Sequence, residues 1–134
     1  LAVICILWSC GKKGPPEPPS GKKPPSVKDL GYSISATTIK LSWTVPPTTA
    51  KAKSPVAGFL IYRNQESLGL EECPNCPIIF KQVGDVPSPR AEALDRPLIY
   101  TQELETGYRY IFKVRAYDDD GMASRDSNLV QFDF

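Results

Sequence analysis

Two cysteines, Cys73 and Cys76, are the residues whose type and spacing could do chemistry, because they stand in the sequence Cys-Pro-Asn-Cys. A zinc site needs about four ligands, usually from a second Cys or His pair, and the chain has no His and no other Cys pair after Cys10. A redox pair needs a helix amino terminus to activate its thiol, and nothing around Cys73 predicts a helix. We therefore predict a structural disulfide across a tight turn, with metal binding and redox chemistry as the alternatives.

Three consecutive aspartates, Asp118 to Asp120, precede Gly121 and raise the question of a calcium site. A calcium loop places its acids at alternate positions and adds a distal Glu, whereas this run leads directly into a glycine turn. We therefore expect a solvated turn and no metal. Because the chain has no His, it offers no Ser-His or Cys-His dyad for nucleophilic catalysis. The sequence predicts a protein that is not an enzyme and uses no cofactor.

A third cysteine, Cys10, ends the apolar run with which the sequence opens. The run has about nine residues, fewer than the roughly twenty of a transmembrane helix and typical of the hydrophobic part of a signal peptide. The alternative is a buried strand that ends in a cysteine. The sequence Leu-Trp-Ser-Cys at residues 7–10 resembles the lipobox of bacterial lipoproteins. The resemblance implies a signal peptide over residues 1–9, diacylglycerol transfer to the Cys10 thiol, cleavage before Cys10 and acylation of the new amino terminus.

Residues 10–25, which follow this run, form a segment rich in Pro and Lys without large apolar side chains. Such a segment cannot offset the entropy of ordering its backbone, so we expect an extended linker that reaches up to roughly 45 Å. Its four lysines against one glutamate either attract it to anionic headgroups or simply extend it in solvent. Gly11 after Cys10 resembles the sorting signal for the outer membrane of enteric bacteria. The expected location is the bacterial cell envelope, lipid-anchored at its outer membrane.

Alternating apolar and polar residues begin at Ser26, and this period of two predicts strands with one buried face. The clearest strands are residues 38–44, with Trp43 on the buried face, and residues 108–116, with Tyr110 there. Further strands are expected at residues 27–34, 56–63, 77–83, 98–102 and 128–132. Seven short strands between Pro, Gly and Asp turns predict an all-β, antiparallel, immunoglobulin-like sandwich. The net charge of +1 argues against a nucleic-acid partner.

The order of these patterns resembles a fibronectin type III domain. The resemblance covers about residues 24–134, and the domain itself is expected over residues 26–134. The resemblance rests on four series: Ile39-x-Leu41-x-Trp43, Gly58-Phe-x-Ile61-Tyr62-Arg63, Leu104-x-x-Gly107-x-x-Tyr110-x-Phe112-x-Val114 and Gly121-x-x-Ser124-x-x-Ser127-Asn128. It implies a core tryptophan at Trp43 and a tyrosine corner at Tyr110, whose hydroxyl bonds to nearby backbone. The chain departs from the family pattern by an insertion around residues 68–77 and by the long stretch 83–96.

Two classes of function fit these observations. The first is a non-catalytic binding or scaffolding module, anchored by lipid and facing an unknown protein or glycan partner. A glycan would be bound by exposed aromatic rings, for which Tyr62, Tyr100 and Tyr117 are the candidates. The second is an envelope thiol-disulfide redox protein that uses Cys73 and Cys76. A cysteine pair in a tight turn between strands, with no helix after it, favours the first class.

Overall fold

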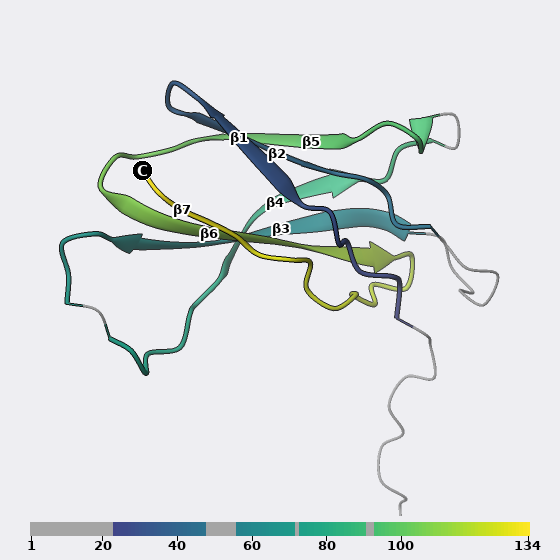
Figure 1. Cartoon of the computed structure of the whole chain (residues 1–134). Helices are drawn as coiled ribbons and strands as arrows, with labels where there is room; N and C mark the ends of the chain where they lie inside the picture. The colour runs from purple at the N-terminus through teal and green to yellow at the C-terminus, as the bar shows by residue number, and fades with distance from the viewer. Residues whose placement is uncertain (1–22, 48–55, 72, 91–92) are drawn as a thin grey trace, which may run out of the picture.

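The computed structural model describes residues 23–47, 56–71, 73–90 and 93–134, and these form an all-β structure (Figure 1). Its strands are β1 (Gly31–Ser35), β2 (Thr38–Trp43), β3 (Val56–Ser67), β4 (Lys81–Pro87), β5 (Leu98–Glu103), β6 (Tyr108–Asp118) and β7 (Val130–Asp133). Within the described residues, no helix is long and apolar enough to cross a membrane. The expected lipidation site Cys10 and the expected signal peptide lie outside these residues.

The strands form two antiparallel sheets that pack face to face (Figure 1). One sheet has three strands in the order β1-β2-β5, and the other has four in the order β4-β3-β6-β7. The chain changes sheet between β2 and β3, returns between β4 and β5, and changes again between β5 and β6. The antiparallel seven-stranded sandwich predicted from the sequence is thereby confirmed.

The core lies between the sheets and is built by the period-two alternation of the strands. In the three-stranded sheet, Ile39, Leu41 and Trp43 of β2 face inward and are fully buried. They meet Phe59 and Ile61 of β3 from the other sheet, and the Trp43 and Phe59 ring centroids lie 5.6 Å apart at a steep angle. Burial of these large side chains supplies the main free energy of folding.

Strand β6 separates its two faces as its sequence predicts. Its inward side chains, Tyr110, Phe112, Val114 and Ala116, are buried. The side chains that alternate with these, including Lys113 and Arg115, lie on the outer face of the four-stranded sheet, since neighbours along a strand point to opposite faces. This outer face is therefore where the chain has polar and charged groups in a fixed register.

One lateral side of the sandwich is closed by Asn128, which links the two sheets ahead of β7. Its amide Oδ1 accepts a hydrogen bond from the Leu30 backbone N at 2.9 Å, and its Nδ2 donates to the Leu30 carbonyl at 2.8 Å. Close by, the ring of Tyr32 in β1 stacks on the ring of Phe132 in β7, with centroids 5.0 Å apart. These contacts join strands that belong to different sheets.

The opposite lateral side is closed by Tyr100 of β5, which reaches over β4. Its hydroxyl donates a hydrogen bond to the Val83 carbonyl at 3.1 Å. Its ring lies so close to Gly84 that a β-carbon at that position would stand 2.6 Å from a ring atom. Burial of the Tyr100 side chain raises the pKa of its phenol. Glycine at position 84 is therefore required by the close approach of the Tyr100 ring.

The two ends of the sandwich are far apart because β3 is long. This strand has twelve residues and spans about 40 Å at roughly 3.3 Å per residue. Residues 23–30 lie at the end where β2 stops and β3 starts, since the Asp29 carboxylate accepts hydrogen bonds from Thr44. The segment that joins β3 to β4 lies at the opposite end (Figure 1). The molecule therefore has a distinct entry end and a distinct loop end.

Two strands, β4 and β1, start four residues later than the sequence predicted, and β3 ends four residues later. Strand β4 begins at Lys81 instead of residue 77, because Ile78 and Ile79 are exposed in the preceding connection. Strand β1 begins at Gly31, although Val27 before it is buried in the core. In both places apolar residues suggested a strand, but the backbone pairing that defines one occurs further along the chain.

Candidate interaction site

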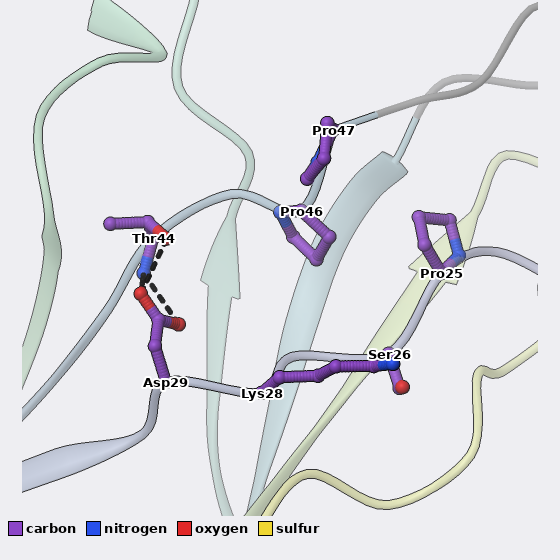
Figure 2. A pocket seen from close by; sticks show the side chains of 7 residues that line it. All are labelled: Pro25, Ser26, Lys28, Asp29, Thr44, Pro46 and Pro47. Carbon is purple, nitrogen blue, oxygen red and sulfur yellow. Dashed lines mark hydrogen bonds between the residues drawn. The ribbon is translucent and has the colours of Figure 1, made fainter.

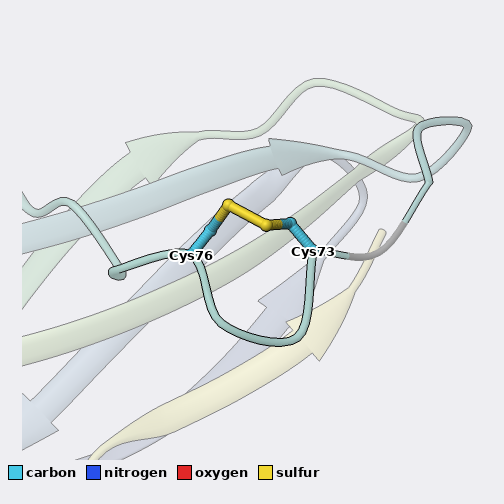
Figure 3. The surroundings of a disulfide bond; sticks show 2 residues. All are labelled: Cys73 and Cys76. Atoms are coloured by element: carbon cyan, nitrogen blue, oxygen red, sulfur yellow. A yellow bond between two sulfur atoms is a disulfide. The ribbon is translucent and has the colours of Figure 1, made fainter.

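The connection between β3 and β4, residues 68–80, is here named the disulfide loop. Cys73 and Cys76 are joined within it by a disulfide, with their Cα atoms 5.3 Å apart (Figure 3). The Cys76 backbone N donates to the Cys73 carbonyl at 3.2 Å, which closes a tight turn. Residues 77–80 have no regular secondary structure and lead into β4. The expected disulfide is therefore present, and its cysteines lie in a turn between strands and not at a helix terminus.

The disulfide loop is fixed to the body of the sandwich at both of its ends. At its start, the Leu68 backbone N donates to the Gly107 carbonyl at 3.0 Å. At its end, the buried Asn64 side chain donates from Nδ2 to the Ile79 carbonyl at 2.9 Å. The Lys113 ammonium also lies 4.0 Å from the centroid of the Phe80 ring, a cation–π contact. The end of the loop thus packs on the outer face of the four-stranded sheet.

Four aliphatic side chains of this loop are exposed. The exposed fraction is 75% for Leu70 and Ile79, 50% for Ile78 and 39% for Leu68. Single exposed aliphatic residues are common on protein surfaces, but Leu68, Leu70 and Ile78 together line one groove of about 700 Å³. The disulfide and the side chains of Glu66, Glu71 and Arg109 also line it. The wall is about as polar as it is apolar, a mixture that is also found at protein-binding sites.

A charged cluster supports the sheet face next to this loop. The Asp126 carboxylate pairs with the Lys113 ammonium at 3.1 Å and with the Arg115 guanidinium at 2.5 Å. Burial opposes ionisation, but hydrogen bonds and charges from Arg115 and Lys113 prevail and lower the pKa of Asp126. Both cations also lie within 6 Å of the Tyr62 ring centroid. The cluster stabilises β6 and its cations are paired with a carboxylate.

The three tyrosines considered for glycan stacking do not form one platform. The Tyr62 ring lies near the cations of Lys113 and Arg115. Tyr100 belongs to the other sheet, and its ring covers Gly84 of β4. Tyr117 covers Gly58, where a β-carbon would lie 2.5 Å from a ring atom. Its hydroxyl donates to the Asp85 carboxylate at 2.8 Å, and this hydrogen bond raises the pKa of Tyr117. Each of these rings therefore already covers part of the sandwich.

A second hollow, of about 600 Å³, lies at the entry end of the molecule (Figure 2). Its walls include Pro25, Pro46 and Pro47. The Asp29 carboxylate on its rim is turned toward Thr44 and accepts hydrogen bonds from the Thr44 hydroxyl and backbone N. This carboxylate therefore holds the entry segment to the end of β2 and has a structural role.

The aspartate run ends β6 and begins the turn after it, so the expected solvated turn contains Asp119 and Asp120 but not Asp118. Asp118 is buried, and its Oδ1 accepts hydrogen bonds from the backbone N of Asp120 at 3.1 Å and of Met122 at 2.8 Å. Gly121 has a φ of 80°, a left-handed conformation that glycine adopts without strain. Over the described ranges, no group of three or more His, Cys, Asp and Glu residues is placed to hold a metal ion.

The structure places the remaining sequence-predicted residues as follows. Trp43 is buried between the sheets, and Tyr110 is buried in β6. The Tyr110 hydroxyl accepts from the Glu105 backbone N at 2.8 Å and donates to the Glu105 carbonyl at 3.2 Å, which is the geometry of a tyrosine corner. Cys10 lies outside the described residues.

Sequence reasoning did not identify the exposed aliphatic residues of the disulfide loop as a site. The available signal was the unbroken pair Ile78-Ile79 beside the cysteine motif, in a stretch that departs from the fold's usual pattern. An apolar pair of this kind is ambiguous between a strand and an exposed loop. Only the pairing of β4 from Lys81 onward distinguishes the two.

Comparisons with known proteins agree on the fold. No family model matches the chain, and no curated protein does. Among solved structures, the third fibronectin III domain of the human KIAA0343 protein is 12% identical, with a TM-score of 0.61 and 92% of each chain covered. The fibronectin type-III domain of the human fibronectin type III domain containing protein 3 is 21% identical, with a TM-score of 0.52, 91% of this chain covered and 90% of the other.

A multidomain structure also matches. The twitchin kinase region from C. elegans is 19% identical with a TM-score of 0.57, and 81% of this chain covers 16% of that one. This chain thus corresponds to a small part of that protein. At these identities the likeness shows the fold alone, and that fold is the fibronectin type III sandwich.

Proposed function

We propose that this protein is a lipid-anchored, non-catalytic binding module of a bacterial cell envelope, most specifically of the outer membrane. The observation that carries the binding role is the disulfide loop, a fixed element with exposed aliphatic side chains on a fibronectin type III sandwich. Fixing a loop before binding reduces the entropy that binding must overcome. The lipid anchor is supported by the sequence before Cys10 alone.

The direction in which the module faces follows from the two ends of the sandwich. A chain anchored at Cys10 enters the domain at residues 23–30, at the end opposite the disulfide loop. The loop then points away from the anchoring membrane by the length of the domain and its linker. This arrangement presents the loop to a partner that is not part of the anchoring lipid surface.

The alternative is a thiol-disulfide redox protein that uses Cys73 and Cys76. A catalytic pair needs a stabilised thiolate, which is usually supplied by a helix amino terminus or a neighbouring cation. Here the pair lies in a turn with no helix after it, and residues 68–80 contain no Lys or Arg. Arg109 lines the same groove, but its guanidinium is paired with the Asp133 carboxylate at 2.8 Å. These observations favour a structural disulfide and thus the binding module.

The anchor is tested by expressing the protein with a complete signal peptide in a bacterial host. We expect the wild type to partition into the detergent phase and its mature amino terminus to be an acylated Cys10. The Cys10→Ala variant should stay in the aqueous phase, and Cys73→Ala should partition as the wild type does. An unmodified mature terminus at another residue would contradict the proposal.

A further inference from the structure

The charges around the groove of the disulfide loop indicate what kind of surface it binds. Glu66 and Glu71 line the groove, and neither forms an ion pair within the part of the chain that the structure describes. Arg109 on the same wall is paired with Asp133 at 2.8 Å. The groove therefore combines exposed aliphatic side chains with unpaired carboxylates.

We infer that the partner is a polypeptide segment with aliphatic side chains flanked by lysine or arginine, which docks in the groove beside the disulfide loop. The inference rests on the proposed function, since it names the partner chemistry of the same module. The aliphatic side chains of the partner would meet Leu68, Leu70 and Ile78. Its cations would pair with Glu66 and Glu71, which gives specificity and a faster association.

A membrane surface does not match this site. Segments that insert into lipid headgroups carry Lys and Arg on the polar side, often with exposed aromatic residues. Residues 68–80 contain no Lys or Arg, and their one aromatic ring, Phe80, lies under the Lys113 ammonium. Anionic headgroups would be repelled by Glu66 and Glu71.

A second copy of this chain does not match the site either. A symmetric dimer places the same patch of both copies in contact. Such a contact through the groove would bring Glu66 and Glu71 close to their own counterparts. Like charges repel each other at a desolvated contact and oppose such a dimer. The charge pattern thus favours a basic partner over self-association.

The inference is tested with a photo-crosslinking amino acid, p-benzoylphenylalanine, placed in the full-length chain in the envelope of its native host. The test positions are 70 and 78, which both line the groove and are 75% and 50% exposed. The matched controls are positions 99 and 129, aliphatic residues that are 53% exposed outside the loop. We expect adducts with a polypeptide from the test positions at about ten times the yield of the controls.

The chemistry of the adduct decides between partners. Mass spectrometry should map the attachment to a segment in which Lys and Arg outnumber Asp and Glu. A Glu66→Gln/Glu71→Gln double variant should lower the yield about three- to ten-fold. The control Asp119→Asn/Asp120→Asn changes two exposed carboxylates elsewhere and should leave it unchanged.

Several outcomes would overturn the inference. The first three are an adduct with phospholipid, an adduct between two copies of the chain, and attachment to an acidic segment. The other two are a yield no higher than at positions 99 and 129, and a yield that the Glu→Gln changes leave unaltered. Detergent partitioning of the same cells separates this failure from failure of the anchor. A protein that partitions as a lipoprotein without loop adducts refutes the inference alone.

Discussion

Hydrogen-bonded side chains on β6 show how single residues hold this sandwich together. Tyr110 fixes the corner before the strand through two hydrogen bonds to Glu105. Asp126 holds Lys113 and Arg115 on the outer face of the same strand. The Lys113 side chain is only 12% exposed, whereas those of Asp126 and Arg115 are about 40% exposed. Both ion pairs share the exposed Asp126 carboxylate, so solvent partly screens both of them.

Tyr110→Phe should lower the free energy of unfolding by about 1–2 kcal/mol, because it leaves both backbone groups of Glu105 without their partner. Urea denaturation measures the change. Tyr108→Phe is the control, since Tyr108 lies on the same strand and its hydroxyl forms no hydrogen bond with the described residues. Equal midpoints for wild type and Tyr110→Phe would refute the role of the corner.

Asp126 should make stability depend on pH in acid. Because the pKa of Asp126 is lowered on folding, its ion pairs stabilise the protein above the unfolded pKa of about 4, and this contribution is lost as the pH falls below it. Asp126→Asn should cost about 1 kcal/mol or less at pH 7, given its exposure.

The cost of Asp126→Asn should be smaller at about pH 2 than at pH 7, because acid protonates the wild-type carboxylate and removes its charge. Thermal unfolding at both pH values measures it. Asp119→Asn, an exposed control in the next turn, should show no difference between the two conditions. A cost that persists unchanged at low pH would assign the effect to packing instead of charge.

The elements differ in how well their sequence predicts them. Strands β2 and β6 begin at the expected residues and end within two residues of the expected ones, because each buries one full face and so alternates clearly. Strand β4 is displaced by four residues at its start, since most of its side chains are only partly buried or exposed and its identity comes from pairing with β3. Burial leaves a pattern in the sequence, whereas backbone pairing at the side of a sheet does not.

The disulfide loop shows the same limit for the candidate site. The cysteine spacing predicted its bond, because a short turn is the arrangement that Cys-x-x-Cys can close without a helix. The contacts that fix the loop could not be predicted, because Asn64 and Ile79 are fifteen residues apart and meet only after β3 and β4 pair. A site built from such a contact needs the register of the sheet.

Replacing both loop cysteines should change the loop and leave the sandwich intact. We expect Cys73→Ser/Cys76→Ser to keep the β-sheet circular dichroism and to lose about 2 kcal/mol or less, because the closed loop is short. The wild type should not accelerate reduction of insulin beyond the same concentration of dithiothreitol. Clear catalysis that the double variant lacks would replace the binding module with the redox alternative.

At the scale of the whole molecule, stability depends on contact between the two sheets. Trp43 of the three-stranded sheet packs against Phe59 of the four-stranded sheet, and both are fully buried. Its indole Nε1 has no hydrogen-bond partner among the described residues. The tryptophan thus contributes to stability through burial and through its contact with the opposite sheet.

Trp43→Ala should lower the free energy of unfolding by about 3–5 kcal/mol, through lost burial and the cavity that remains. This is a large share of the 5–15 kcal/mol typical of a domain. Denaturant unfolding followed by circular dichroism measures it. Ile99→Ala, on the solvent side of the same sheet, is the control and should cost far less. A Trp43→Ala midpoint equal to that of the wild type would refute the assigned core.

The contacts of Asn128 and Tyr100 also bear on how such a protein tolerates crowding. The edge strands of a sandwich expose unpaired N–H and C=O groups to neighbouring molecules, and this exposure promotes aggregation. Asn128 occupies both backbone groups of Leu30 on one side, and Tyr100 occupies the Val83 carbonyl and covers Gly84 on the other. If the protein is confined to a surface as proposed, it meets its own copies at high local density. Side chains that occupy these backbone groups would then reduce strand pairing between neighbouring copies.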